Sequence, residues 1–216
     1  MKRLLRFLLM TGIVAALLFG LAGSWRDPWL WSYLAIWCMV GAAAMLMISD
    51  DLAKERFSPP SAGADRLSLR AIRVIALAHL VVGVLDNARF HWSVVPPALR
   101  VVGLVGFGLS FLLVIHAMSV NRFFSAVVRV QDDRGHHVID RGPYAHVRHP
   151  GYAGMIPAVP FSALALGSWV SLAIALVYSG LILRRVLFED RFLHANLDGY
   201  ANYARRVRYR LIPGAW

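Results

Sequence analysis

Long uncharged apolar runs recur along this chain of 216 residues and restrict what it can fold into. A transmembrane helix needs about 20 mainly apolar residues, and four runs reach or approach that length, at 4–23, 29–49, 71–87 and 99–120. Hydrophobic residues make up 58% of the chain, whereas soluble domains contain about 45–50%. The pattern predicts an all-α, polytopic integral membrane protein.

The last apolar stretch, residues 150–183, holds 34 uncharged residues. As one helix it would be about 51 Å long, well beyond a hydrocarbon core of roughly 30 Å. Gly167 and Ser168 lie near its centre. We therefore expect a helical hairpin, with one arm over 152–166 and the other over 169–188, which brings the transmembrane helices to about six. Pro157 and Pro160 are expected to kink the first arm.

The basic residues indicate how these helices are oriented. With a cytoplasmic N-terminus, 20 of the 23 lysines and arginines fall on the cytoplasmic side, as the positive-inside rule requires. Five transmembrane helices would instead place the basic segment 184–210 on the opposite side. We expect both termini in the cytoplasm and the chain in a bacterial inner membrane. The charge of +11 indicates membrane lipids rather than nucleic acid, because the basic residues cluster beside apolar runs.

Several smaller features complete this description. The N-terminal segment 1–24 resembles a signal peptide, but the uncharged run 7–25 is long enough to span a membrane, so we expect the first helix here. Cys38 is the only cysteine, which excludes an internal disulfide and a cysteine zinc motif, and we expect no metal. In the connection 50–70 we expect one helical turn around 52–56. His79 and His116 lie in apolar runs and are expected to hydrogen-bond between helices.

The stretch 135–154 is polar, aromatic and rich in glycine, and it lies between two apolar segments. Gly142 and Pro143 predict a bend, and Pro150 predicts the start of the next helix. A lone loop histidine commonly has no role, but so dense a polar cluster beside a membrane helix needs partners. The stretch therefore predicts a pocket on the cytoplasmic side, formed by the side chains of His136, Tyr144, Arg148, His149 and Tyr152.

Charged groups on either side of this stretch leave two alternatives open. Asn121 and Arg122 follow the fourth apolar run, and Arg122 is either a headgroup anchor or an anion-binding group in the pocket. Arg185 and Glu189 share one helix face, so they either form an ion pair or together hold an amino-acid moiety. The alternation over 127–131 predicts a short strand or an extended segment.

Three C-terminal motifs occur together in this chain: GHHVIDRGPYAHVRHPGYAG, RRVLFED and GYANYARRVRYRLIPGAW. With them, the chain resembles the isoprenylcysteine carboxyl methyltransferase family, including its bacterial members, and the related phospholipid N-methyltransferases. The combination of RHPxYxG, two adjacent acids and YxxYxxxVxxRLIP is specific. The resemblance covers roughly residues 50–216, is tightest from 121 onward, and extends to the segments NRFFSAVVRVQDDRGH, DDLAKER and LDNARFHWSVVP.

The resemblance implies an S-adenosyl-L-methionine-dependent methyltransferase that acts on a lipophilic or lipid-anchored acceptor. It divides the single domain 1–216 into four N-terminal transmembrane helices, 1–120, and a cofactor-binding half, 121–216, with the hairpin at 152–188. Arg185 and Glu189 are implied as catalytic, and Asn121, Arg122 and Arg185 as acceptor-binding. The implied cofactor-binding residues are His136, Val138, Ile139, Gly142, Tyr144, Arg148, His149, Tyr152, Gly154, Glu189, Tyr200 and Tyr203.

The reaction expected first is carboxyl O-methylation of an isoprenylcysteine-like or other lipid acid, with Arg185 or Arg122 holding the carboxylate. Methylation of a phospholipid or another amine is an alternative, and it would need a base such as Glu189. An NADPH-dependent sterol-type membrane reductase is a second alternative, because such enzymes share a similar histidine-proline-tyrosine stretch. A non-enzymatic lipid-binding membrane protein is the third.

Overall fold

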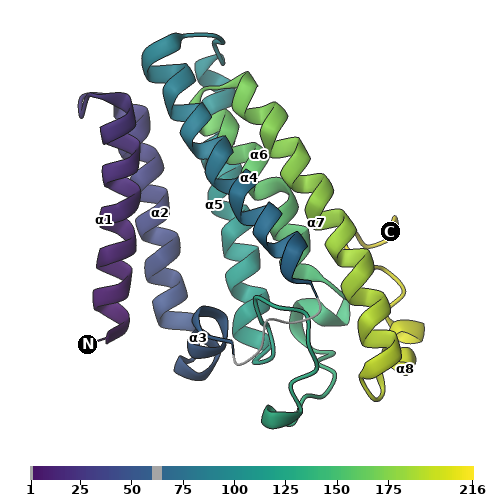
Figure 1. Ribbon diagram of the computed structural model, residues 1–216. Helices are drawn as coiled ribbons and strands as arrows, with labels where there is room; N and C mark the ends of the chain where they lie inside the picture. The colour runs from purple at the N-terminus through teal and green to yellow at the C-terminus, as the bar shows by residue number, and fades with distance from the viewer. Residues whose placement is uncertain (1, 60–64) are drawn as a thin grey trace.

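The computed structural model describes residues 2–59 and 65–216 (Figure 1). Within these residues the regular elements are helical and none is a strand, so the expected all-α fold is confirmed and 127–131 forms no strand. The α-helices are α1 (Lys2–Ala22), α2 (Pro28–Met47), α3 (Asp50–Phe57), α4 (Arg66–Leu85), α5 (Pro97–Val120), α6 (Pro150–Leu166), α7 (Trp169–Asn196) and α8 (Tyr200–Arg206). Short turns are η1 (Asp86–Phe90), η2 (Asp132–Arg134) and η3 (Gly142–Ala145).

Among the described residues, five helices are long and apolar enough to cross a membrane: α1, α2, α4 with η1, α5 and α7. They match the long apolar runs of the sequence. α6 is also apolar but has 17 residues, fewer than the roughly 20 that a straight span needs. The protein is therefore a polytopic all-α membrane protein with five long helices and one shorter apolar helix.

The expected hairpin is present as α6 and α7. Gly167 ends α6 with a φ of 86°, a left-handed conformation that suits glycine. Ser168 then caps α7, since its hydroxyl accepts a hydrogen bond from the backbone N–H of Ser171 at 2.9 Å. Pro157 and Pro160 lie inside α6 without ending it.

Glycines let α5 and α6 approach closely. A Cβ on Gly103 would lie 2.8 Å from the carbonyl oxygen of Phe161 and would overlap the backbone of Ala165. A Cβ on Gly154 would lie 2.6 Å from the carbonyl oxygen of Ser110. Small residues at such contacts are typical of membrane helices, where backbones pack directly on each other.

A buried polar contact joins α2, α4 and α6. The hydroxyl of Ser162 lies 2.8 Å from the Tyr33 hydroxyl and 3.0 Å from Nε2 of His79. This confirms the interhelical hydrogen bond expected for His79. The expectation does not hold for His116, whose side chain is exposed and has no hydrogen bond to another helix in the described part of the chain.

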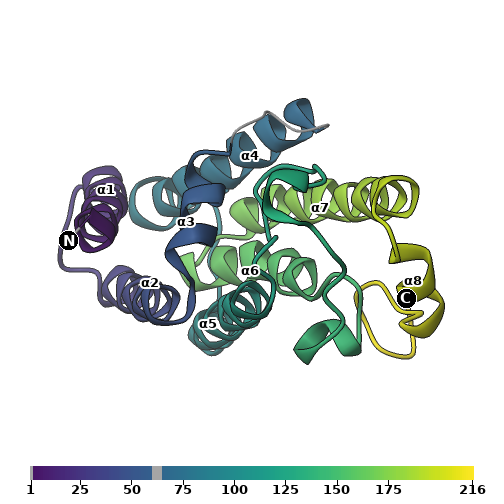
Figure 2. The same ribbon diagram turned by 90° about the horizontal axis from the view of Figure 1, so that it is seen from below.

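One end of the bundle gathers the segments that connect the helices (Figures 1 and 2). There, α3 and α8 lie beside the segment 121–149, which runs between α5 and α6. α3 is longer than the single turn expected around 52–56, because Ser49 caps it by accepting from the N–H of Leu52 at 3.3 Å. Residues 60–64 of the expected connection lie outside the described residues.

Candidate functional site

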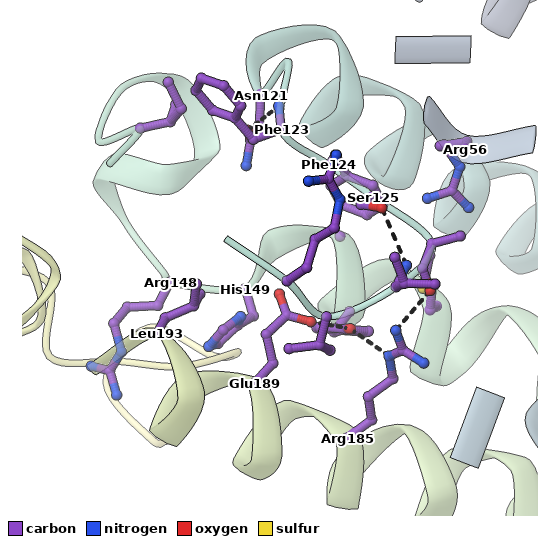
Figure 3. Close-up of a pocket in the computed structure, with 18 of the residues that line it drawn as sticks. Arg56, Asn121, Phe123, Phe124, Ser125, Arg148, His149, Arg185, Glu189 and Leu193 are labelled. Carbon is purple, nitrogen blue, oxygen red and sulfur yellow. Dashed lines mark hydrogen bonds between the residues drawn. The ribbon is translucent and has the colours of Figure 1, made fainter. Parts of the chain in front are cut away.

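A cavity of about 350 Å³ lies at this end of the bundle. Segment 121–149, α8 and the C-terminal part of α7 contribute mainly polar and aromatic side chains. Another part of the wall is mainly apolar and comes from α4, α6 and α7, with Leu69, Ile72, Ala76, Met155 and Ile182, and with Arg73 as a charged residue of α4. Figure 3 shows Arg148 and His149 on one side of the pocket and Arg56 and Arg185 on the other, with Glu189 between them.

The stretch 135–154 folds around its glycines and prolines as its composition indicates. Gly135 and Gly142 have φ values of 64° and 58°, and Pro143 lies in the first turn of η3. His149 is not helical, and Pro150 begins α6. The N–H groups of Arg148 and His149 donate to the carbonyl oxygens of residues 209 and 210, both at 2.9 Å, so the C-terminal tail holds this stretch in place.

Asp190 is the buried centre of a hydrogen-bond network. Its carboxylate accepts from Nε and Nη2 of Arg148 at 2.8 and 3.1 Å and from Nε of Arg210 at 2.9 Å. Nε2 of His149 donates to it at 3.1 Å and the hydroxyl of Tyr200 at 2.9 Å. These donors offset the cost of burying a carboxylate that is only 3% exposed. The network thereby fixes α8, the C-terminal tail and the stretch before α6 around α7.

The hydroxyl of Tyr152 lies between Arg185 and Glu189. It donates to Oε2 of Glu189 at 2.5 Å and accepts from Nε of Arg185 at 2.9 Å. Among the described residues, no direct ion pair joins Arg185 to Glu189 within 4 Å. The Tyr152 hydroxyl bridges the two side chains instead of the direct ion pair considered from the sequence. Nη2 of Arg185 donates to the carbonyl oxygen of Ala126 at 2.8 Å. Nη1 makes no hydrogen bond with the part of the chain that the structure describes, although Oδ2 of Asp65 lies 3.1 Å away.

His136 is held against the ring of Phe123, with 4.5 Å between ring centres. The backbone N–H of Gln131 donates to Nδ1 of His136 at 3.2 Å. This contact requires a free lone pair on Nδ1, so the neutral ring carries its proton on Nε2. Burial, together with the nearby charge of His137, lowers the pKa of His136 to about 4. His136 is therefore a neutral donor near pH 7.

Three tyrosines pack at the polar end of the cavity. The hydroxyl of Tyr203 donates to the carbonyl oxygen of Tyr144 at 2.7 Å, and the Tyr200 and Tyr203 rings meet edge to face at 5.6 Å between centres. Burial raises the pKa of all three phenols above the ordinary value. These groups therefore remain protonated at neutral pH and act as hydrogen-bond donors.

The structure brings most of the predicted site residues together at this cavity. Those that line it are Asn121, His136, Val138, Ile139, Tyr144, Arg148, His149, Tyr152, Arg185, Glu189, Tyr200 and Tyr203. Three others are not in its wall. Gly142 packs against Val120 and Gly154 against α5, while Arg122 has an exposed side chain 3.6 Å from Asp51.

Some residues of the site were not singled out from the sequence. Asp190 follows Glu189 directly, so the adjacent acids of RRVLFED were the available signal. Arg56 lies in DDLAKER and Phe124 in NRFFS, both of which belong to the resemblance, but nothing in the letters indicates that they face one cavity. Tyr178 is an interior residue of a long apolar helix, and no sequence pattern distinguishes it.

Comparison with known proteins agrees with this arrangement of motifs. Residues 101–195 match the model of the isoprenylcysteine carboxyl methyltransferase family. The chain is 30% identical over 92 residues to proteins named "Probable protein-S-isoprenylcysteine O-methyltransferase" from Oryza sativa subsp. indica and subsp. japonica, covering 42% of this chain and 48% of theirs. It is 28% identical over 143 residues to "Cobalt-zinc-cadmium resistance protein CzcN" from Cupriavidus metallidurans, covering 64% of this chain and 59% of that protein.

The matched part contains nearly all of α5 and α7 and all of α6, and therefore the hairpin, the stretch 135–154 and the acids Glu189 and Asp190. The matches span about half to three-fifths of the length of the curated relatives. The resemblance drawn from the sequence is confirmed over residues 101–195, which match the model of the isoprenylcysteine carboxyl methyltransferase family.

Proposed function

We propose that the protein is an S-adenosyl-L-methionine-dependent methyltransferase that methylates the carboxyl group of an isoprenylcysteine-like or other lipid acid. The observation that carries this proposal is the two-sided cavity, in which a polar wall and an apolar wall meet beside Tyr152. A polar cofactor and a lipophilic acceptor need these two environments side by side. The family match supports the same reaction class.

The polar wall has groups that fit S-adenosyl-L-methionine. Oε1 of Glu189 accepts no hydrogen bond from the described residues, so it is available to an ammonium group such as that of the methionine moiety. The neutral His136 and the backbone at Val138 and Ile139 lie on the same wall and would hold the adenosine part. Tyr200 and Tyr203 would cover the bound molecule.

The apolar wall fits a lipophilic acceptor. α4 contributes Leu69, Ile72 and Ala76 to it, and α4 and α7 are both long enough to cross a membrane. An acceptor tail lying along these helices would remain in an apolar environment while its headgroup reached Tyr152. Burying such a tail contributes about 0.8 kcal/mol for each CH₂ group.

In the proposed reaction, the protein acts mainly by positioning the acceptor relative to the methyl group. S-adenosyl-L-methionine, when bound, supplies an electrophilic methyl group. A carboxylate acceptor is already anionic, so no residue of the chain has to remove a proton from it. Arg185, held by Tyr152 and by the carbonyl oxygen of Ala126, would orient the attacking oxygen. Exclusion of water by the surrounding wall would strengthen this electrostatic contact.

The proposal is tested by calorimetry on the purified protein with S-adenosyl-L-methionine and, separately, with NADPH. We expect only the first to bind. Binding of NADPH alone would contradict the methyltransferase proposal, and absence of binding by either would contradict any enzyme that uses these cofactors. Incubation with a labelled methyl donor and a membrane lipid extract then identifies the acceptor from the molecule that becomes labelled.

Glu189→Gln provides a residue-level test. We expect it to weaken binding of S-adenosyl-L-methionine about tenfold or more, because a charge-assisted hydrogen bond to the ammonium group is lost. The matched control is Asp198→Asn, which removes an exposed carboxylate outside the cavity. Equal affinity in Glu189→Gln and the wild type would contradict the role of Glu189, while an unchanged Tm shows that the fold is intact.

A further inference from the structure

The acceptor side of the cavity is here the side on which Arg185 lies, and α3 brings another guanidinium group to it (Figure 3). Glu55 is only 6% exposed and accepts from the Ser125 hydroxyl at 2.8 Å and from Nη2 of Arg129 at 3.0 Å. These contacts tie α3 to segment 121–149. Arg56, the next residue, lines the cavity, and its guanidinium carbon lies 5.2 Å from the centre of the Phe124 ring. The anchored Glu55 therefore determines where Arg56 points.

Arg56 differs from the buried arginines of the cavity in its lack of a carboxylate partner. Those arginines each have an acid within ion-pair distance: Arg129 with Glu55, Arg148 with Asp190, and Arg185 with Asp65. Among the described residues, no Asp or Glu oxygen lies within 4 Å of Arg56. Burial lowers the pKa of the Arg56 guanidinium, and the nearby positive charges of Arg185 and Arg73 lower it further. A partly desolvated cation in this position is stabilised by an anion placed beside it.

The charges that line the cavity are not all neutralised by ion pairs within the described residues. Glu189 gives the cofactor side a carboxylate that is not neutralised by an ion pair within the described residues. On the acceptor side, Arg56 and the exposed Arg73 have no carboxylate partner among the described residues. Nη1 of Arg185 lies 3.1 Å from Oδ2 of Asp65 but makes no hydrogen bond within the described part of the chain. An ammonium headgroup on the acceptor side would be repelled by these groups, whereas an anionic headgroup would be attracted.

We propose that Arg56 determines acceptor specificity by pairing with an anionic headgroup, a carboxylate or a phosphate, on a lipophilic molecule. Arg56 lies outside the matched residues 101–195, so this selectivity comes from the N-terminal half of the chain. The inference depends on the proposed function only in treating the bound amphiphile as the methyl acceptor. The preference for an anion is a property of binding and is measurable without turnover.

The test compares four isoprenyl amphiphiles with the same tail and a carboxylate, phosphate, carboxamide or ammonium headgroup. Their binding to the wild type in an uncharged detergent is measured by calorimetry. We expect the carboxylate or the phosphate to bind about tenfold or more tightly than the carboxamide, and the ammonium compound to bind weakest. The ratio between the carboxylate and phosphate arms identifies which anion the site prefers.

Arg56→Gln is expected to remove this preference, so that the acid and the carboxamide bind equally, while Arg56→Lys retains part of it. The matched control is Lys54→Gln, which removes the same charge from an exposed position on α3 and should keep the wild-type preference. A wild type that does not distinguish the headgroups, or an Arg56→Gln variant that still distinguishes them, overturns the inference. Binding of S-adenosyl-L-methionine to each variant reports the intact fold and tests the proposed function separately.

Discussion

Glu189 and Asp190 show how two adjacent carboxylates take different roles. Consecutive residues on an α-helix point about 100° apart, so the two side chains of α7 face different surroundings. Glu189 faces the cavity and accepts a single hydrogen bond, from Tyr152, among the described residues. Asp190 faces the packed interior and accepts from two arginines, a histidine and a tyrosine. The first is available to a ligand, and the second holds the walls of the cavity together.

Asp190→Asn is expected to lower the stability of the protein strongly. The substitution removes the charge that compensates Arg148 and Arg210, and breaking a buried ion pair costs about 3–5 kcal/mol. The measurement is the Tm of the purified protein in detergent. Asp132→Asn is the control, because Asp132 is exposed. Equal Tm values for the two variants would show that the Asp190 network does not stabilise the fold.

His136 predicts a pH dependence of stability between about 4 and 6.5. Its pKa is lowered to about 4 in the folded protein, while an unfolded histidine has a pKa near 6.5. The unfolded chain therefore takes up this proton first as the pH falls, and stability decreases from about pH 6.5 toward 4. Tm measured across this range should fall less steeply in His136→Asn. His146→Asn, which removes an exposed histidine of the same segment, should keep the wild-type slope, and identical slopes in all three proteins would contradict the assignment.

The individual residues of the site were only partly predictable from the sequence. His149, Tyr152 and Glu189 stand in motifs, and the structure places them at one cavity. The arrangement of Tyr152 between Arg185 and Glu189 was not predictable, because spacing on a helix shows that two residues share a face but not that a third group from α6 enters between them. The partners of Asp190 come from three distant segments, so no local pattern indicates them.

At the scale of elements, the close contact between α5 and α6 fixes the position of α6, whose first turns line the cavity. Gly103→Ala is expected to destabilise the protein by about 1–3 kcal/mol, as overpacking does, because the new methyl group would meet backbone atoms of α6. Gly180→Ala is the matched control, since its Cβ would meet nothing within 4 Å and alanine favours a helix. A Tm for Gly103→Ala at or above the control value would contradict this packing.

The helical hairpin was predictable from two features of the sequence: the length of the apolar run 150–183 and the distribution of basic residues. A run of 34 uncharged residues is too long for one crossing, and Gly167 offers a reversal. The role of α3 was not predictable, because a short charged helix carries no long periodic pattern. Its position depends on Glu55 meeting Ser125 and Arg129, residues about 70 positions later in the chain.

For the whole molecule, the orientation in the membrane is the prediction that connects the fold to the function. The structure places α3, α8 and segment 121–149 at one end of the bundle and the turn Gly167–Ser168 at the other (Figure 1). The distribution of basic residues predicts that the first of these ends is cytoplasmic. Both a cytoplasmic supply of cofactor and an acceptor entering from the bilayer would then reach the same cavity.

Cysteine labelling tests this orientation. Cys38→Ala removes the only cysteine, after which Arg205→Cys on α8 and Val94→Cys near the other end each add one exposed thiol. In intact expressing bacteria, a membrane-impermeant maleimide should label Val94→Cys, while Arg205→Cys should react only after permeabilisation. Lys54→Cys on α3 should behave as Arg205→Cys does, because the cavity requires α3 and α8 on the same side. Labelling of Arg205→Cys in intact cells would reverse the topology and place the cavity away from the cytoplasm.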